Sequence, residues 1–246
     1  MAYAEIVGKA VEYRAGDTVL KGFLAFDSAI EGKRPAILVV HEWWGHNEYA
    51  RKRARMLAAL GYTAFAVDMY GNGKQALHPD EAGKFASALQ RDWPTTQARF
   101  KAGIEVLSNH PSVDKGKIGA IGYCMGGGIV LEMARRGIKL DGVVSFHGSL
   151  STSSPAEAGQ LKAKILVLNG AEDPFVKAED IAAFKNEMNI AKADYSFISY
   201  AGAKHSFTNS EANKLGEKFD LPLAYNEQAD QQSWQEMTKF FANLFK

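Results

Sequence analysis

The sequence contains a single cysteine and no apolar run long enough to span a membrane. One thiol cannot form an internal disulfide, so packing alone must hold the fold together. A membrane-spanning helix needs about 18 uninterrupted apolar residues, and no segment comes near that length. Residues Met1 to Glu5 also lack the charged start and apolar run of a secretory signal. We therefore expect a cytoplasmic protein in a reducing compartment, with no membrane as a partner.

An excess of charge of either sign is also missing, because 29 Lys and Arg residues offset 28 Asp and Glu residues to leave a net charge of +1. This balance gives no electrostatic reason to expect nucleic acid or an anionic membrane surface as a partner. The one basic cluster, Arg51 to Arg55, is typical of a solvated helix face. No pair of histidines has the spacing of metal ligands, so we expect no metal and no cofactor.

The 246 residues, 46% of them hydrophobic, suit one domain over residues 1–246 without linkers or repeats. Residues 11–14 and 19–26 predict an antiparallel hairpin. Apolar runs typical of strands buried on both faces follow at residues 36–40, 63–67, 117–121, 142–146, 165–168 and 195–200. Helical patterns separate most of these runs, and the clearest is the apolar stripe from Trp234 to Phe245. The alternation predicts an α/β fold with a mostly parallel, doubly wound sheet and an N-terminal antiparallel hairpin.

Sites in such sheets form just beyond the carboxyl ends of the strands. The segment Gly122 to Gly126, which reads G-Y-C-M-G, follows the run at residues 117–121 and precedes an apparent helix at residues 129–135. Strand, tight turn and helix make the nucleophile elbow of the α/β-hydrolases, with cysteine in place of serine. The turn requires a strained, positive φ at Cys124 and small residues on both sides.

Two other interpretations of this segment compete with the elbow. A lone cysteine is often only a small buried core residue, but the flanking glycines and the strand-to-helix position favour a nucleophile. A glycine-rich phosphate loop would read G-x-x-x-x-G-K-[ST] or G-x-G-x-x-G, and this segment fits neither pattern well. We therefore assign Cys124 as the nucleophile.

Elbow hydrolases place the acid and then the base after the nucleophile in the chain. Asp173 follows the run at residues 165–168, with Glu172 as an adjacent competitor, and His205 follows the last strand. We predict that His205 takes the thiol proton and that Asp173 holds the imidazole in the required tautomer. Five other histidines fit this role less well: His41, His46, His78, His110, which resembles a helix end, and His147, which follows the wrong strand for a base.

The loop from His41 to Asn47 follows the strand at residues 36–40 and is expected to complete an oxyanion hole. By position, the two donors are the backbone N–H groups of Trp43 and Met125. Met125 begins a helix, where the helix dipole favours negative charge. Two such donors stabilise a developing oxyanion by a few kcal/mol each.

Five segments resemble the dienelactone hydrolase (carboxymethylenebutenolidase) family of the α/β-hydrolase superfamily. They are H-E-W-W-G at residues 41–45, V-D-M-Y-G at 67–71, G-Y-C-M-G-G at 122–127, G-A-E-D-P at 170–174 and A-K-H-S-F at 203–207. In that family the glutamate that matches Glu42 contacts the resting thiol, and substrate binding releases it so that the thiol ionises. The physics is coherent, because an ionised carboxylate beside a thiol favours the neutral thiol. A helix-entry or surface charge is the alternative role for Glu42.

The resemblance is incomplete where the family holds a substrate carboxylate with two arginines. The position four residues after the histidine is Asn209, and the segment at residues 78–85 offers only Lys84 as a Lys or Arg. One lysine does not replace a bidentate guanidinium site. We expect a pocket for neutral or aromatic esters and lactones, lined by Trp44, Tyr70, Lys84, Phe207 and Asn209. Core packing is the alternative for Phe207.

The prediction is a cysteine-dependent hydrolase of small ester or lactone bonds that works through a thioester, as a monomer or weak dimer. The alternative is a ligand-binding or redox-sensing protein on a non-catalytic hydrolase fold. The elbow, acid, base and additional glutamate are all present, which favours the enzyme. No second cysteine exists to resolve an oxidised thiol, which disfavours the redox sensor.

Overall fold

The computed structural model describes residues 5–246, which form eight strands and seven helices. The chain divides into two compact units, Met1–Ala120 and Ile121–Lys246. Strand β5 (Val113–Tyr123) begins in the first unit and ends in the second. The expectation of one domain over residues 1–246 stays a prediction.

The first unit has a sheet that changes from antiparallel to parallel pairing. Its strand order is β1-β2-β4-β3, with β2 antiparallel to both β1 and β4, and β3 parallel to β4. The strands of this sheet are β1 (Ile6–Ala15), β2 (Thr18–Asp27), β3 (Arg34–Val40) and β4 (Thr63–Val67). The helices of this unit are α1 (Glu48–Ala59), α2 (Pro79–Arg91) and α3 (Trp93–Asn109). Parallel pairing brings the carboxyl ends of β3 and β4 to one edge.

The second unit has three adjacent parallel strands, in the order β6-β7-β8. They are β6 (Gly142–Phe146), β7 (Lys164–Gly170) and β8 (Tyr195–Tyr200). The helices are α4 (Met125–Arg135), α5 (Ala178–Ile190), α6 (Ala212–Phe219) and α7 (Glu227–Leu244). The loops after these strands, which hold Asp173 and His205, therefore leave the sheet at the same edge.

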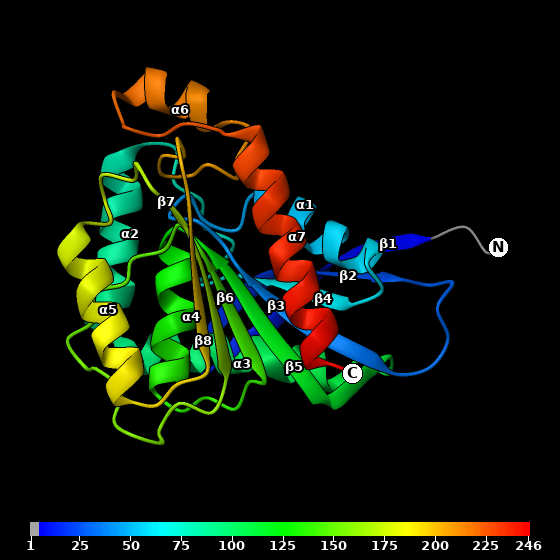
Figure 1. Cartoon of the computed structure of the whole chain (residues 1–246). Coiled ribbons are helices and arrows are strands. Elements are labelled where there is room, and N and C mark those ends of the chain that lie inside the picture. Colours follow the sequence, from blue (N-terminus) through cyan, green and yellow to red (C-terminus); the bar gives the residue numbers. More distant parts are fainter. Residues whose placement is uncertain (1–4) are drawn as a thin grey trace. The chain divides into compact units, whose positions relative to one another are not determined.

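Helices α4 and α7 cover opposite faces of β6. A Cβ added to Gly142 would lie 2.6 Å from Leu244 of α7, whereas one added to Gly127 of α4 would lie 2.6 Å from the Oγ of Ser145. Positions 142 and 145 are an odd number of residues apart, so their side chains point to opposite faces of the strand. Figure 1 shows α4 in green and α7 in red on either side of these strands.

Most of the predicted strands agree closely with the structure. Residues 63–67, 142–146 and 195–200 coincide with β4, β6 and β8, and the predicted hairpin is β1 and β2. The apparent helix at residues 129–135 is the last part of α4. The α/β class with its mixed sheet is confirmed.

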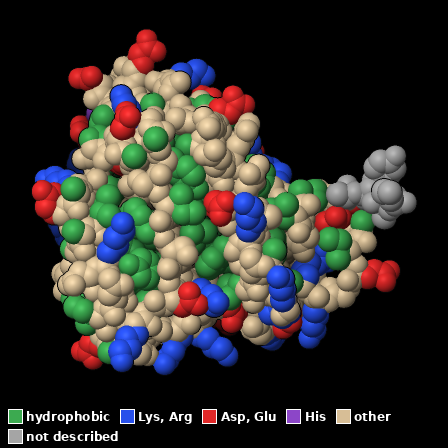
Figure 2. Space-filling view, viewed as in Figure 1, with side chains coloured by type: hydrophobic (Ala, Val, Ile, Leu, Met, Phe, Trp, Pro, Cys, Tyr) green, Lys and Arg blue, Asp and Glu red, His purple; other side chains and the backbone are tan. Residues whose placement is uncertain are grey.

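The described part of the chain, residues 5–246, has no helix that is both long and apolar enough to cross a membrane. On the face drawn in Figure 2, basic and acidic side chains both occur, without one large patch of a single sign. This distribution agrees with the balanced charge of the sequence.

Candidate active site

Cys124 lies between β5 and α4 in a backbone conformation that few residues adopt. Its φ is 54° and its ψ is −119°, in the region that usually requires glycine. A Cβ added to Gly122 would overlap the carbonyl oxygen of Gly126, so the turn closes only because residue 122 has no side chain. The structure thus has the strained turn that the glycine spacing predicts. The cysteine is partly exposed rather than buried in the core.

Replacing Gly122 with alanine is expected to destabilise the fold, because its Cβ meets the main chain of Gly126 and Gly127 rather than a movable side chain. Overpacking of this kind costs about 1–3 kcal/mol or more, and a thermal melt monitored by circular dichroism measures it. Gly128→Ala is the control, because a Cβ there makes only ordinary contact, 3.4 Å from the carbonyl of Ser149. Equal melting temperatures for the two variants would contradict this account of the turn.

Asp173 and His205 are brought together by the loops that follow β7 and β8. The Nδ1 of His205 lies 2.8 Å from the Oδ2 of Asp173, whose side chain is completely buried. The other carboxylate oxygen accepts the N–H of Phe175 at 2.9 Å, which fixes the plane of the carboxylate. The neighbouring Glu172 is exposed. Of the two acidic candidates, it is therefore Asp173 that contacts the imidazole.

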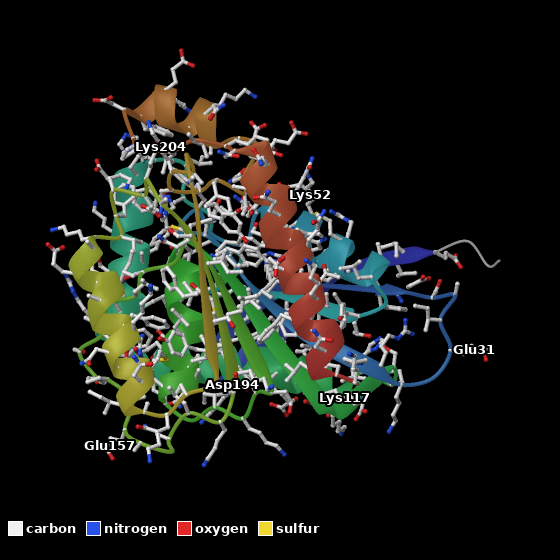
Figure 3. The ribbon with its side chains drawn as sticks, in the orientation of Figure 1. Glu31, Lys52, Lys117, Glu157, Asp194 and Lys204 are labelled. Carbon is white, nitrogen blue, oxygen red and sulfur yellow. The ribbon has the colours of Figure 1, made fainter. Side chains whose placement is uncertain are left out.

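The edge at which His205 lies can be followed in Figure 3. Asp194, which precedes β8, is at the lower end of that strand, and Lys204, the neighbour of His205, lies beyond its upper end. His205 is therefore on the loop past the carboxyl end of β8, where the sequence predicted it.

His205 is also hydrogen-bonded to Cys124. Because Asp173 occupies Nδ1, the nitrogen that faces the sulfur is Nε2. Burial by itself lowers the pKa of His205, but its interactions with Cys124 and Asp173 outweigh burial and raise the pKa to about 10. A raised pKa makes this imidazole a good acceptor for a proton from the sulfur. The three side chains thus form a continuous chain of contacts within the second unit.

In the first unit, the loop after β3 holds Glu42 and Trp43 in a defined conformation. The carbonyl of Glu42 accepts the N–H of Gly45 at 3.1 Å and lies 2.6 Å from the Nδ1 of His41. The carbonyl of Trp43 accepts the hydroxyl of Tyr70 at 2.7 Å. Bonds on both carbonyls fix the peptide planes around Trp43, and Glu42 itself is buried. The roles predicted for Glu42 and for the amide of Trp43 stay predictions.

The expected pocket residues occupy different environments. Trp44 and Tyr70 are buried in the first unit, and Lys84 is exposed on α2. Phe207 has no exposed surface and packs edge-on against His147, with ring centroids 5.2 Å apart. Asn209 is buried, and its side chain accepts the N–H of Glu211 just before α6. These positions give Phe207 a core environment and leave Lys84 as a surface cation.

Four of the five other histidines have structural partners, and the fifth, His46, is buried in the first unit. His41 accepts the N–H of Met69, and burial lowers its pKa. His78 caps α2, and His110 ends α3 as predicted. His147 was placed at the wrong strand for a base, yet its ring lies beside His205, with centroids 5.3 Å apart. In the sequence, the hint that His147 would lie near the site was its position directly after the strand at residues 142–146. Among residues 5–246 no group of three potential ligands is arranged to hold a metal ion.

The order of these parts along the chain defines the class of protein. Strand β5, the turn at Cys124 and helix α4 come first, and Asp173 and His205 follow beyond β7 and β8. This is the order of the α/β-hydrolases.

Two solved structures share the fold over nearly the whole chain. The dienelactone hydrolase-like promiscuous phosphotriesterase P91, from metagenomic libraries, is 34% identical, with a TM-score of 0.91 and coverage of 99% of this chain and 100% of that one. The protein m3DLH is 35% identical, with a TM-score of 0.93 and coverage of 98% and 99%.

The family model described as "Dienelactone hydrolase family" matches residues 20–245, so the chain belongs to the dienelactone hydrolase family. "Protein usf" of Aquifex pyrophilus is 26% identical over 225 residues, which cover 89% of this chain and 95% of that protein. A "Putative carboxymethylenebutenolidase" of Saccharolobus solfataricus is 26% identical, with coverage of 97% and 99%. The resemblance seen in the sequence is confirmed, and the chain is a dienelactone hydrolase-like hydrolase.

Proposed function

We propose that this hydrolase cleaves small ester or lactone bonds with Cys124 as the nucleophile, through a thioester. The observation that carries the proposal is the contact chain from Cys124 to His205 to Asp173, at the end of a strained strand-to-helix turn. Cys124 combines a positive φ with a ψ of −119°, outside the left-handed helical region, and residues strained in this way cluster at active sites.

The first half of the reaction forms the thioester. The proton of the thiol moves to Nε2 of His205, and the sulfur attacks the carbonyl carbon to give a tetrahedral oxyanion. The oxyanion collapses, the C–O bond to the leaving group breaks, and His205 returns the proton to the leaving oxygen. A lactone keeps that alcohol within the same molecule.

The second half restores the enzyme. Water gives a proton to His205 while its oxygen attacks the thioester carbon, and collapse then expels the sulfur, which recovers the proton. Asp173 holds the tautomer throughout, because its carboxylate accepts the proton on Nδ1. We assign the oxyanion hole to the N–H groups of Met125, the first residue of α4, and Trp43.

We propose that Glu42 keeps the thiol neutral until substrate binds, as the family resemblance implies. Glu42→Gln is expected to lose turnover of a short-chain ester by about tenfold or more while its circular dichroism and melting temperature stay those of the wild type. Glu172→Gln, which removes an exposed carboxylate next to Asp173, is the matched control and should keep full turnover. Wild-type turnover in Glu42→Gln would reject the gating role.

Neutral substrates are favoured over carboxylates because the family's pair of arginines is missing. Lys84 is exposed, and the side chain of Asn209 already bonds the chain before α6. Aromatic esters are favoured by Phe175, a residue that is 52% exposed and whose ring lies edge-on to His205 at 4.9 Å between centroids. An aromatic leaving group can pack on this ring as it departs.

A panel of substrates tests the proposed class. We expect hydrolysis of neutral aryl esters and simple lactones to exceed hydrolysis of dienelactone, whose carboxylate lacks its arginine partners. The solved relative P91 is described as a promiscuous phosphotriesterase, so a phosphotriester belongs in the panel. A protein that binds these compounds without turning any of them over would instead be the ligand-binding alternative.

A further inference from the structure

A buried histidine beside the nucleophile takes no part in the steps above. His147 directly follows β6, has no exposed surface and has a φ of 39°. Its own N–H donates to the carbonyl of Leu168 in β7 at 2.8 Å, which anchors its main chain to the sheet. A positive φ in a buried, well-bonded residue indicates that the position of this side chain is imposed by its surroundings.

The ring of His147 joins two segments that lie far apart in the sequence. Its Nδ1 is 3.1 Å from the backbone nitrogen of Cys124, whose N–H is shared with the carbonyl of Phe146 at 3.0 Å. Its Nε2 is 2.7 Å from the Oγ1 of Thr208. A backbone N–H can only donate, so Nδ1 accepts and carries no proton. The neutral ring therefore has its proton on Nε2 and donates it to Thr208.

Thr208 belongs to the same short buried loop as His205. The loop is held from within by a hydrogen bond from the N–H of Asn209 to the carbonyl of Ser206 at 2.9 Å. The ring of His147 also packs against the ring of His205, with centroids 5.3 Å apart and planes at 68°. One side chain thus touches the main chain of the nucleophile, the loop of the base and the ring of the base.

The main chain under His147 leaves little room for adjustment. A Cβ on Gly148 would lie 2.6 Å from the carbonyl carbon of Gly127, so the turn after β6 and the start of α4 are in backbone contact. This contact fixes the main chain on both sides of the site at which the His147 ring bonds the Cys124 N–H. A displacement of about 1 Å between reacting groups can cost roughly 100-fold in rate.

We propose that His147 is a positioning residue, which spaces the Cys124 turn from the His205 loop by bonding both, so that the sulfur meets Nε2. The claim rests on the proposed function, in which Cys124 and His205 are the nucleophile and the base. The distance that His147 sets between the Cys124 turn and the His205 loop does not depend on which bond the enzyme cleaves.

Two substitutions break the link from opposite ends. Thr208→Val keeps the shape of the side chain but removes the acceptor for Nε2, and Thr208→Ser restores a hydroxyl. His147→Asn tolerates a positive φ and keeps an acceptor for the Cys124 N–H, but is too short to reach Thr208. We expect each of Thr208→Val and His147→Asn to lower kcat about tenfold or more, with KM within about twofold and Thr208→Ser close to the wild type.

A double-mutant cycle and a spectroscopic reading separate positioning from general packing. If the link is one unit, the double variant loses no more kcat than the worse single variant. The His205 pKa, followed by NMR of ¹⁵N-labelled histidine, should fall in both single variants, because the imidazole then sits less closely against Cys124. Melting temperatures measure any loss of fold in the same samples.

The outcomes are distinct. Wild-type kcat and an unmoved His205 pKa in Thr208→Val would overturn the proposal, as would a loss of kcat that merely follows the loss of folded protein and is equal in Thr208→Ser. If the wild type hydrolyses nothing in the panel, the proposed function fails on its own. The response of the His205 pKa then still decides whether His147 sets the distance between base and sulfur.

Discussion

Cys124→Ala is expected to lower kcat for a chromogenic aryl ester by about 10⁴-fold or more, with the fold unchanged. The variant removes the only atom that can form the thioester, and the remaining groups provide no alternative nucleophile on the contact chain. The partly exposed position of Cys124 means that the change creates no cavity in the core. Initial rates over a range of ester concentrations measure the effect.

Cys124→Ser is the informative companion to this variant. It keeps an atom that can attack but raises the cost of removing its proton, so we expect low but measurable activity between that of the wild type and that of Cys124→Ala. Undiminished hydrolysis by Cys124→Ala would refute the cysteine mechanism, because this chain has no second thiol to take over.

Asp173→Asn is expected to lower kcat roughly 10³-fold and to lower the pKa of His205 from its value of about 10. The amide removes the charge that favours the imidazolium. If its carbonyl oxygen keeps the hydrogen bond from the N–H of Phe175, its NH2 group faces Nδ1 and donates to it, so the imidazole must adopt the other tautomer. We expect the pKa of His205 to fall because both the hydrogen bond and the charge of Asp173 raise it in the wild type. NMR titration of labelled histidine and kcat across pH measure the two effects together.

Asp194→Asn is a suitable control for this variant. Asp194 lies at the opposite end of β8 and pairs with Lys164 on the surface at 3.0 Å. Its replacement should therefore change neither kcat nor the pKa of His205. A pKa of His205 that stays near 10 in Asp173→Asn would show that Asp173 does not govern the charge of the imidazole.

The fold was predictable wherever one local pattern decided the structure. Residues 63–67 and 142–146 form β4 and β6, which are buried at every position as their apolar runs predicted, whereas β8 has the predicted ends but is only partly buried. Helix α5 was missed because it buries little, chiefly Phe184 and Met188, and so has no clear stripe. Helix α2 starts from a His78 cap and Pro79, a signal for a helix start that the apolar pattern does not register.

The contact chain of the site was predictable for a different reason. The strained turn needs glycines at fixed spacing, and parallel strands bring their following loops to one edge, so the sequence order predicted the side chains that meet. The bond from His205 to Asp173 rather than to Glu172 required coordinates, since both acids follow β7. The two bonds of His147 also required them, because nothing in a sequence shows which backbone N–H a buried imidazole accepts.

The most direct measurement locates the acyl group during turnover. The protein is mixed with excess p-nitrophenyl acetate, quenched in acid within the first turnover, digested and examined by mass spectrometry. The account predicts one acetyl group per molecule, on the peptide that contains Cys124, and none in Cys124→Ala. An acetyl group carried by a different residue during hydrolysis, with Cys124 unmodified, would contradict it.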